Sequence, residues 1–242
     1  FELMAANVRV PDMVAGDRRA QLAACHVAEV GFTELCGAHG ADKVERLVDA
    51  MLDHSERLAR AELLKLPDGT FSFDDWIDDD GIDVDKPILL RVTITKTGDR
   101  ILFDWTGSSP QVKGALNATH SFTTAACYCG LLSVMDGTLP NNEGLFRAVE
   151  VVTEPGTITN CALPAATAAR GLTGFRMVDT VFGALAQMVP DRVFAAGDGG
   201  NTNVSIGGYD EERRPYIFCD FTCGAWGGRP FADGLEGNSN VF

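Results

Sequence analysis

Residues 101–117 constrain the fold of this 242-residue chain most, because a strand pattern passes there directly into a polar loop. Large apolar side chains alternate with other residues from Ile101 to Trp105, which is the two-residue period of a β-strand. The next residues, from Thr106 to Gln111, are small, polar and turn-forming, and loops of this kind often carry function. The segment therefore predicts a sheet strand that ends in a loop offering hydroxyl, amide and backbone groups.

Two helices are predicted before the strands. Asp17 can cap a helix that runs to about Cys36, and a glycine-containing break follows at 37–40. A second helix is expected from Asp42 to about Lys65, with apolar residues three and four positions apart along one side. We therefore expect a helical pair over residues 17–65.

The remainder of the chain mixes strands with helices. A hairpin turn is expected at Thr97-Gly98-Asp99. The pattern predicts a hairpin-rich region at 66–117 and a mixed α/β region at 118–242. The whole chain, 1–242, is expected to be an internal portion of a larger subunit. Strands are expected at 70–73, 88–96, 100–105, 146–152, near 158, 193–196, 202–206 and 216–221, and helices at 121–135 and 175–189. This order predicts an α+β fold of mixed helices and largely antiparallel sheets.

Charge and hydropathy exclude several classes of partner. The chain has 34 acidic against 20 basic residues, a formal net charge of -14, which argues against nucleic acid and against an anionic membrane surface. No apolar run is long enough to cross a bilayer, and the first residues lack a signal-peptide pattern, so we expect a cytoplasmic protein. The chain begins without Met and ends at 237–242 in residues untypical of a terminus, which suggests an excerpt of a larger subunit.

Clusters of potential metal ligands have simpler interpretations. The acidic run from Asp74 to Asp80 has no neighbouring His, which favours a solvated loop over a metal site. The seven cysteines are odd in number and most have apolar neighbours, so we expect free thiols in a reducing compartment. A zinc site from the cysteines at 127, 129, 219 and 223 is the alternative, but Cys127 and Cys129 would face different sides of a helix.

Three positions are candidates for chemistry outside the polar loop. His120 lies at the start of the predicted buried helix, where it is either a proton carrier or a capping, hydrogen-bonding residue. Arg229, among glycines, could hold a carboxylate or a phosphoryl group, or could pair with a nearby aspartate. The glycine-rich segment 197–203 lacks the ending of a P-loop and is a weak signal for a nucleotide.

The chain resembles the hydantoinase B family, which includes part of the 5-oxoprolinases and subunits of the acetone and acetophenone carboxylases. The resemblance extends over essentially all 242 residues, with motifs in the same order. These motifs are Asn7–Pro11, Gly16–Ala24, Leu66–Gly69, Asp79–Gly81, the loop Thr106–Gln111, Pro140–Gly144 and Gly224–Gly234.

The resemblance implies one subunit of an ATP-dependent hydrolase acting on a cyclic amide such as a lactam or hydantoin. A hydantoinase A-type partner would bind ATP-Mg and phosphorylate a carbonyl oxygen, in a hetero-oligomer. A divalent metal in the complete subunit would supply water, but the family's metal motif does not occur here, so no ligand is assigned. The alternatives are a subunit of an ATP-dependent ketone carboxylase and a non-catalytic scaffold. The expected substrate-binding residues are Thr106, Ser108, Gln111, Asn117, His120 and Arg229.

Overall fold

A computed structural model describes residues 1–8, 11–136, 139–197 and 201–223, with the side chains of 201–205 and 219–223 excluded. The chain forms two compact units, the first from residues 1–51 with 203–221, the second built mainly from residues 52–202. Within the described ranges, no helix combines the length and the apolar character needed to cross a membrane.

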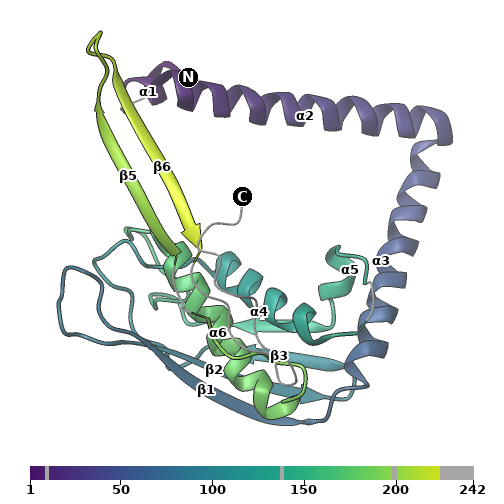
Figure 1. Cartoon of the computed structure of the whole chain (residues 1–242). Coiled ribbons are helices and arrows are strands. Elements are labelled where there is room, and N and C mark those ends of the chain that lie inside the picture. Colours follow the sequence, from purple (N-terminus) through teal and green to yellow (C-terminus); the bar gives the residue numbers. More distant parts are fainter. Residues whose placement is uncertain (9–10, 137–138, 198–200, 224–242) are drawn as a thin grey trace. The chain divides into compact units, whose positions relative to one another are not determined.

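A four-stranded sheet forms the centre of the second unit (Figure 1). Its strands are β1 (Gly69–Ile77), β2 (Ile88–Thr97), β3 (Arg100–Asp104) and β4 (Val149–Val152), in the order β1-β2-β3-β4. The first two pairings are antiparallel, and β3 pairs with β4 in parallel. Gly98, with a φ of 58°, allows the tight β2–β3 turn that the sequence predicts. The α+β prediction with largely antiparallel sheets is therefore confirmed.

One face of the sheet is covered by helices and contains the core. The register places Phe73 opposite Val92 and Phe103 opposite Ile94 and Val151, so these apolar side chains share a face. Helix α6 (Arg170–Met188) packs on β1 and β2, and α4 (His120–Val134) packs on α6. The largest fully buried side chains are Trp105, Phe103, Leu63, Leu90, Ile94, Ile101, Leu131, Leu145, Ile158, Met177, Leu185 and Val92. The alternating apolar pattern of the strands thus fits a sheet with one covered face.

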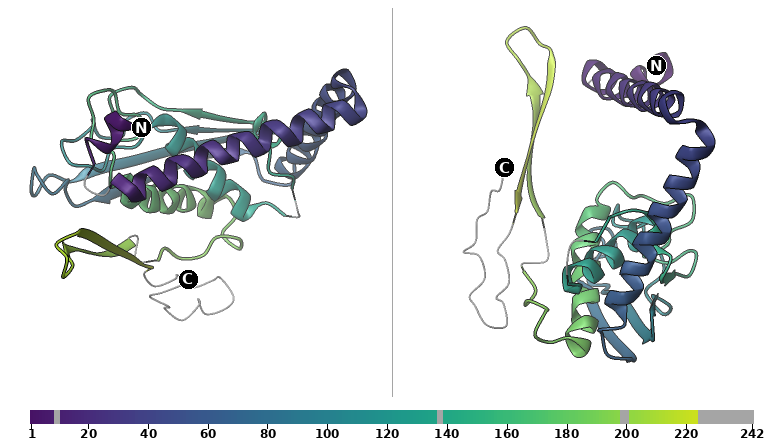
Figure 2. Two further views of the ribbon diagram at one scale, coloured as in Figure 1. Left: turned by 90° about the horizontal axis from the view of Figure 1, so that it is seen from above. Right: turned by 90° about the vertical axis from the view of Figure 1, so that its right-hand side faces the viewer.

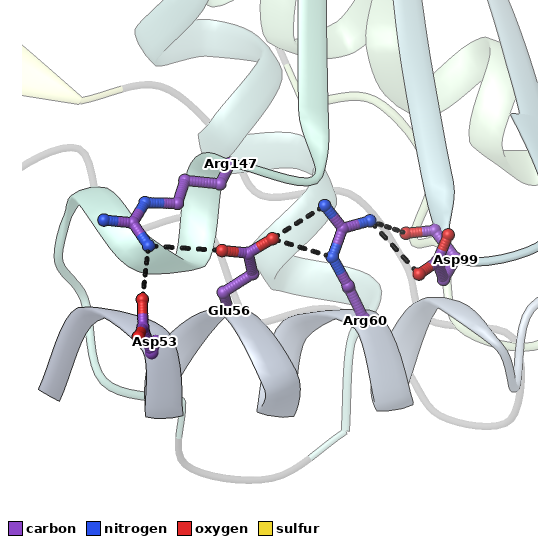
Figure 3. A network of polar contacts seen from close by, with 5 residues as sticks. All are labelled: Asp53, Glu56, Arg60, Asp99 and Arg147. Atoms are coloured by element: carbon purple, nitrogen blue, oxygen red, sulfur yellow. Dashed lines mark hydrogen bonds and ion pairs between the residues drawn. The ribbon is translucent and has the colours of Figure 1, made fainter. Parts of the chain in front are cut away.

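A charged network attaches residues 52–63 of α3 (Ala41–Leu63) to the sheet (Figure 3). Arg60 is paired with Glu56 at 2.8 Å and with Asp99, in the β2–β3 turn, at 3.1 Å. Arg147, after the short helix α5 (Glu143–Phe146), pairs with Asp53 at 2.8 Å and with Glu56 at 3.2 Å. Hydrogen bonds from Arg60 and then Arg147 lower the pKa of Glu56. The network fixes three separate chain segments at one end of the sheet.

The first unit contains little buried surface. It has the short helix α1 (Glu2–Ala5), the helix α2 (Pro11–His39), residues 41–51 of α3, and most of the paired strands β5 (Asn201–Tyr209) and β6 (Pro215–Cys223). Helix α2 is one continuous helix of 29 residues, none of which is buried (Figure 2). Its exposed large apolar residues are Met13, Leu22, Val27, Val30, Phe32 and Leu35.

Several predicted boundaries were wrong for local physical reasons. Helix α2 begins at Pro11, a residue favoured in a first helical turn, so Asp17 lies inside the helix and does not cap it. The strand expected at 146–152 begins at Val149, because the Asn142 side chain accepts a hydrogen bond from the Gly144 N–H and caps α5. Helix α6 begins at Arg170, five residues before the predicted start.

Two predicted strands did not form. Residues 193–196 are irregular, because an apolar composition does not supply a neighbouring strand to pair with the backbone. Near residue 158 the structure has isolated bridges, from Thr157 to Pro110 and to Asn160, and no extended strand.

Candidate functional site

The parallel pairing of β3 with β4 brings the loops that follow these strands together at one edge of the sheet. The Trp105 N–H donates to the Val152 carbonyl at 2.9 Å, continuing the ladder by one residue. Beyond it, the Gln111 N–H donates to the Gly156 carbonyl at 2.8 Å, and the Ile158 N–H donates to the Ser109 carbonyl at 2.9 Å. Because parallel strands end at the same edge, residues about 50 positions apart in sequence become neighbours.

Two carboxylates hold the turn that opens the loop after β3. The Asp104 carboxylate accepts a hydrogen bond from the Thr106 N–H at 2.9 Å, and Glu154 accepts one from the Gly107 N–H at 3.0 Å. Gly107 has a φ of 88°, a left-handed conformation that other residues adopt only with strain. The turn therefore presents Thr106, which is exposed, beside two acidic side chains.

His120, on helix α4, contacts the first residue after β4. It is the first residue of α4, exposed, and follows the N-cap residue Thr119. Its Nδ1 lies 2.9 Å from the hydroxyl oxygen of Thr153, the residue after β4. Five residues thus lie at the ends of β3 and β4 or contact residues there, the two carboxylates through backbone N–H groups and His120 through Thr153, and we name them the strand-end cluster: Asp104, Thr106, His120, Thr153 and Glu154. The cluster combines hydroxyl, imidazole and carboxylate groups, which can bind a polar ligand and carry protons.

Sequence reasoning does not find three of these five residues. Local patterns identify Asp104 only as a strand residue, and they do not single out Thr153 and Glu154. Thr153 and Glu154 could have been noticed because they directly follow a predicted strand. However, local patterns do not show that this strand pairs in parallel with β3. For His120 the structure shows the hydrogen-bonding interaction that the sequence left open.

Ser108 faces the sheet. It is buried, its hydroxyl donates to the Arg91 carbonyl at 3.2 Å, and it accepts from the Arg91 N–H at 3.1 Å. Ser109 accepts similarly from the Leu89 N–H at 2.8 Å. The two hydroxyls therefore attach the loop to the backbone of β2.

Gln111 and Asn117 hold the backbone of a second loop. The Asn117 amide is completely buried, accepts from the Val112 N–H at 2.8 Å and donates to the Ala166 carbonyl at 3.0 Å, among other loop carbonyls. The Gln111 side-chain oxygen accepts from the Ala162 N–H at 2.7 Å. Both side chains thus shape the loops around the cluster, and a direct contact of either with substrate stays a prediction.

Arg229 and residues 198–200 of the glycine-rich segment lie outside the described residues, so the predicted roles of Arg229 and of this segment stay predictions.

The acidic run is more ordered than the solvated loop that was predicted. Asp74 and Asp75 lie in β1 and pair with Arg91 and Arg176 respectively, because cross-strand and helix neighbours supply the guanidinium groups. Asp80 accepts backbone N–H groups, most strongly that of Asp83 and then that of Gly114, which lower its pKa to about 2.

The cysteines on α4 point to different environments, as their spacing predicts. Cys127 is buried, and desolvation raises the pKa of its thiol to about 12, although the Trp105 indole N–H donates to its sulfur at 3.2 Å. Cys129 is exposed. Among the residues with described positions, no group of three or more His, Cys, Asp or Glu side chains is arranged to hold a metal ion.

The chain is therefore an α+β protein in which helices cover one face of the sheet, and the strand-end cluster lies where the parallel strands β3 and β4 end. The chain belongs to the hydantoinase B/oxoprolinase family, whose model matches residues 1–242. It is 31% identical over 252 residues to the B-type component of a putative D-/L-hydantoinase from Pseudomonas sp. (strain NS671), covering 100% of this chain and 42% of that protein. The chain therefore spans about two-fifths of the length of this relative.

Two solved structures share the fold. The ATP-dependent caprolactamase from Pseudomonas jessenii superposes with a TM-score of 0.79 at 28% identity, over 91% of this chain and 37% of that chain. The nucleotide-free structure of an acetone carboxylase also gives a TM-score of 0.79, at 16% identity, over 100% of this chain and 36% of that chain. At that identity the second likeness concerns the fold alone.

Proposed function

We propose that this chain is part of the B-type subunit of an ATP-dependent enzyme that hydrolyses cyclic amides. The observation that carries the proposal is the family match over the whole chain, supported by the 31% identity to the hydantoinase component from Pseudomonas. The runner-up is a subunit of an ATP-dependent ketone carboxylase. The hydrolase is favoured because the identity to the caprolactamase structure is 28%, against 16% to the acetone carboxylase structure.

The proposed reaction divides the chemistry between two subunits. An unstrained amide resists hydrolysis at neutral pH, whereas phosphorylation of its oxygen by an ATP-binding A-type partner creates a good leaving group. In the proposal, Thr106 and His120 face the substrate, because both are exposed members of the strand-end cluster. The Thr106 hydroxyl would hydrogen-bond a polar ring atom, and the His120 imidazole would carry a proton.

The family resemblance implies a divalent metal for the complete subunit. The described residues do not fit such a site, since they contain no suitable group of three ligands. We therefore assign no step of the reaction to a metal held by these residues.

The proposal is tested with the complete subunit produced together with its A-type partner. Hydantoin, 5-oxoproline, caprolactam, acetone and acetophenone are each supplied with ATP and magnesium, with and without bicarbonate. Mass spectrometry detects ring-opened or carboxylated products, and phosphate release reports ATP use. Bicarbonate-independent ring opening coupled to phosphate release is expected. Bicarbonate-dependent carboxylation would replace the hydrolase by the carboxylase. If the two subunits assemble without ATP and no product forms from any substrate, the non-catalytic scaffold is the function that remains.

Two substitutions test the assignment of site residues. We expect His120→Gln and Thr106→Val each to lower kcat/KM for the cyclic amide by roughly tenfold, the effect of about one lost polar contact. His54→Gln is the matched control, because His54 is also an exposed helix residue but lies outside the cluster. Equal kcat/KM in His120→Gln, Thr106→Val and the control would remove both residues from the site while leaving the family-based function intact.

A further inference from the structure

The two residues that follow β4 each hold a different segment of the chain. The hydroxyl oxygen of Thr153 lies 2.9 Å from Nδ1 of His120, the first residue of α4. The Glu154 carboxylate accepts a hydrogen bond at 3.0 Å from the Gly107 N–H, in the turn after β3. Because Thr153 and Glu154 are adjacent in sequence, one dipeptide connects the start of α4 with the turn that carries Thr106.

The backbone of this dipeptide is fixed on both sides. Before it, the Val152 carbonyl accepts from the N–H of the completely buried Trp105 at 2.9 Å. After it, the Glu154 carbonyl accepts from the hydroxyl of the buried Thr157 at 2.7 Å. A side chain can orient a neighbouring group only where its own backbone is held in place. Both residues of the dipeptide meet this condition.

The imidazole of His120 depends on Thr153 for its orientation. The backbone of His120 is held by α4, where its carbonyl also accepts from the Thr124 hydroxyl at 2.9 Å. Its side chain is exposed, and among the described residues Thr153 supplies the one hydrogen bond of the ring. Exposed side chains without such a contact change rotamer within nanoseconds. Loss of the Thr153 hydroxyl would therefore free the ring and leave the helix intact.

A hydroxyl is a suitable partner for an imidazole that carries a proton. Because a hydroxyl both donates and accepts, it can bond to Nδ1 whether or not this nitrogen carries a hydrogen. A carboxylate in the same place would only accept, which would restrict the ring to forms with a hydrogen on Nδ1. With Nδ1 bonded to Thr153, Nε2 of His120 is the ring nitrogen without a partner among the described residues. The bond at one ring nitrogen determines the state of the other.

Glu154 acts on a turn that is also packed. The side chain of Arg91 lies close to Gly107, since an added β-carbon there would be 3.5 Å from the Arg91 Cδ atom. Removing the Glu154 carboxylate would take away the hydrogen bond to the Gly107 N–H and leave this packing in place. The effect of Glu154 on the turn can therefore be separated from general disruption of the loop.

We propose that Thr153 and Glu154 are positioning residues for the reaction. Thr153 orients the imidazole of His120 and leaves Nε2 free, and Glu154 fixes the turn that presents Thr106. This inference rests on the proposed hydrolase function for the roles of His120 and Thr106, and it adds the residues that orient them. It requires no contact of Thr153 or Glu154 with substrate.

The first test uses NMR of the complete subunit with its A-type partner, produced with isotope-labelled histidine. Thr153→Val keeps the shape of the side chain and loses the hydroxyl, whereas Thr153→Ser keeps the hydroxyl. We expect wild type and Thr153→Ser to show the ring nitrogens of a hydrogen-bonded His120, and Thr153→Val to show those of a free ring. His120→Gln identifies the signals, and Thr95→Val is the matched control at another half-buried threonine. Wild-type signals in Thr153→Val would overturn the assignment.

Kinetics distinguish positioning from a general structural effect. Thr153→Val should lower kcat for the cyclic amide by roughly fivefold to tenfold with KM changed by less than about twofold, because one positioning hydrogen bond is lost. In a His120→Gln background the same substitution should cause no further loss, since a residue that acts through His120 then has no imidazole to orient. An equal loss in both backgrounds would overturn the proposal for Thr153.

Hydrogen exchange at the Gly107 N–H tests Glu154. Glu154→Ala should speed this exchange by at least about threefold, whereas Glu154→Gln retains an oxygen acceptor and should stay closer to wild type. Glu150→Ala is the matched control, because Glu150 is also exposed and lies in β4. Equal rates in Glu154→Ala and wild type would overturn the assignment of Glu154. If wild type opens no ring, the proposed hydrolase function fails, while the NMR and exchange results still decide whether the two residues hold their partners.

Discussion

Helices α2 and α6 are both long and rich in apolar residues, yet they are used differently. In the first unit, α2 has 29 residues and buries none of them. In the second unit, α6 has 19 residues and buries one side against the sheet and α4: Thr173, Gly174, Met177, Thr180, Val181, Phe182, Ala184, Leu185 and Met188. The difference lies in the pattern, because the apolar residues of α6 follow the helical period and those of α2 occur around the whole helix.

The strands of the two units differ in the same way. Strands β1 to β4 share a buried face, whereas the paired strands β5 and β6 expose apolar side chains such as Tyr209, Tyr216 and Phe218. An isolated two-stranded sheet is marginally stable in water. The comparison teaches that the second unit has its own core, while the elements of the first unit depend mainly on local hydrogen bonds.

The largest expected effect is the loss of a core side chain in the second unit. Phe103→Ala should lower the free energy of unfolding by about 3–5 kcal/mol, because Phe103 is fully buried between strand and helices. Phe32→Ala in α2, where the ring is 60% exposed, should change it by less than about 0.5 kcal/mol. Urea denaturation followed by circular dichroism measures both. Similar losses for the two variants would contradict the contrast between the units.

Glycine substitutions sharpen the same comparison with smaller effects. A β-carbon at Gly144 would collide with the Leu52 carbonyl oxygen, so Gly144→Ala should destabilise by about 1–3 kcal/mol. Gly31 in α2 has no atom near the position of an added β-carbon, and Gly31→Ala should stabilise by about 0.5–1 kcal/mol. Thermal unfolding measures both shifts, and opposite signs are expected. A destabilising Gly31→Ala would show that α2 is closely packed.

Side-chain amides give a third contrast. Asn117→Ala leaves buried backbone groups without partners and should cost about 1–3 kcal/mol. It should also speed hydrogen exchange at Val112, whose N–H donates to the Asn117 side chain. In the first unit, Asn7 donates to the Leu3 carbonyl at 2.7 Å but is exposed, so Asn7→Ala should change stability by less than about 0.5 kcal/mol. Unchanged exchange at Val112 would show that Asn117 does not hold this part of the loop backbone.

The smallest effects concern pH. The pKa of Asp80 is lowered from 3.8 to about 2, so its carboxylate stabilises the folded state above pH 3.8, and this contribution is lost as the pH falls towards about 2. In the first unit, the Arg214 N–H lowers the pKa of Asp210 in the same direction. Asp80→Asn should therefore lower the melting temperature at neutral pH and match wild type at the acidic end. A difference that persists at about pH 1, below both pKa values of Asp80, would exclude the carboxylate charge as its cause; Asp210→Asn provides the comparison.

Local patterns predicted most of the elements. The second helix, the β2–β3 hairpin with Gly98, and helices α4 and α6 were all located from periodicity and turn residues. The polar loop after β3 was located too, whereas substrate contacts of Thr106 and His120 stay predictions. Thr153, which contacts His120, and Glu154, which accepts from the Gly107 N–H, could not be found, because they come near β3 through a strand pairing between residues about 50 positions apart.

The sequence by itself determined the family, the α+β class and the position of the polar loop, because motifs and periodicities are local properties of the chain. Only the tertiary structure decided how the loop residues are used. It turned Ser108 to the sheet and Asn117 to the backbone of residues 112–114 and 166. The physical reason is that burial and hydrogen-bond partners depend on which segments meet in space, as β2 meets the loop at Ser108 and residue 166 meets Asn117.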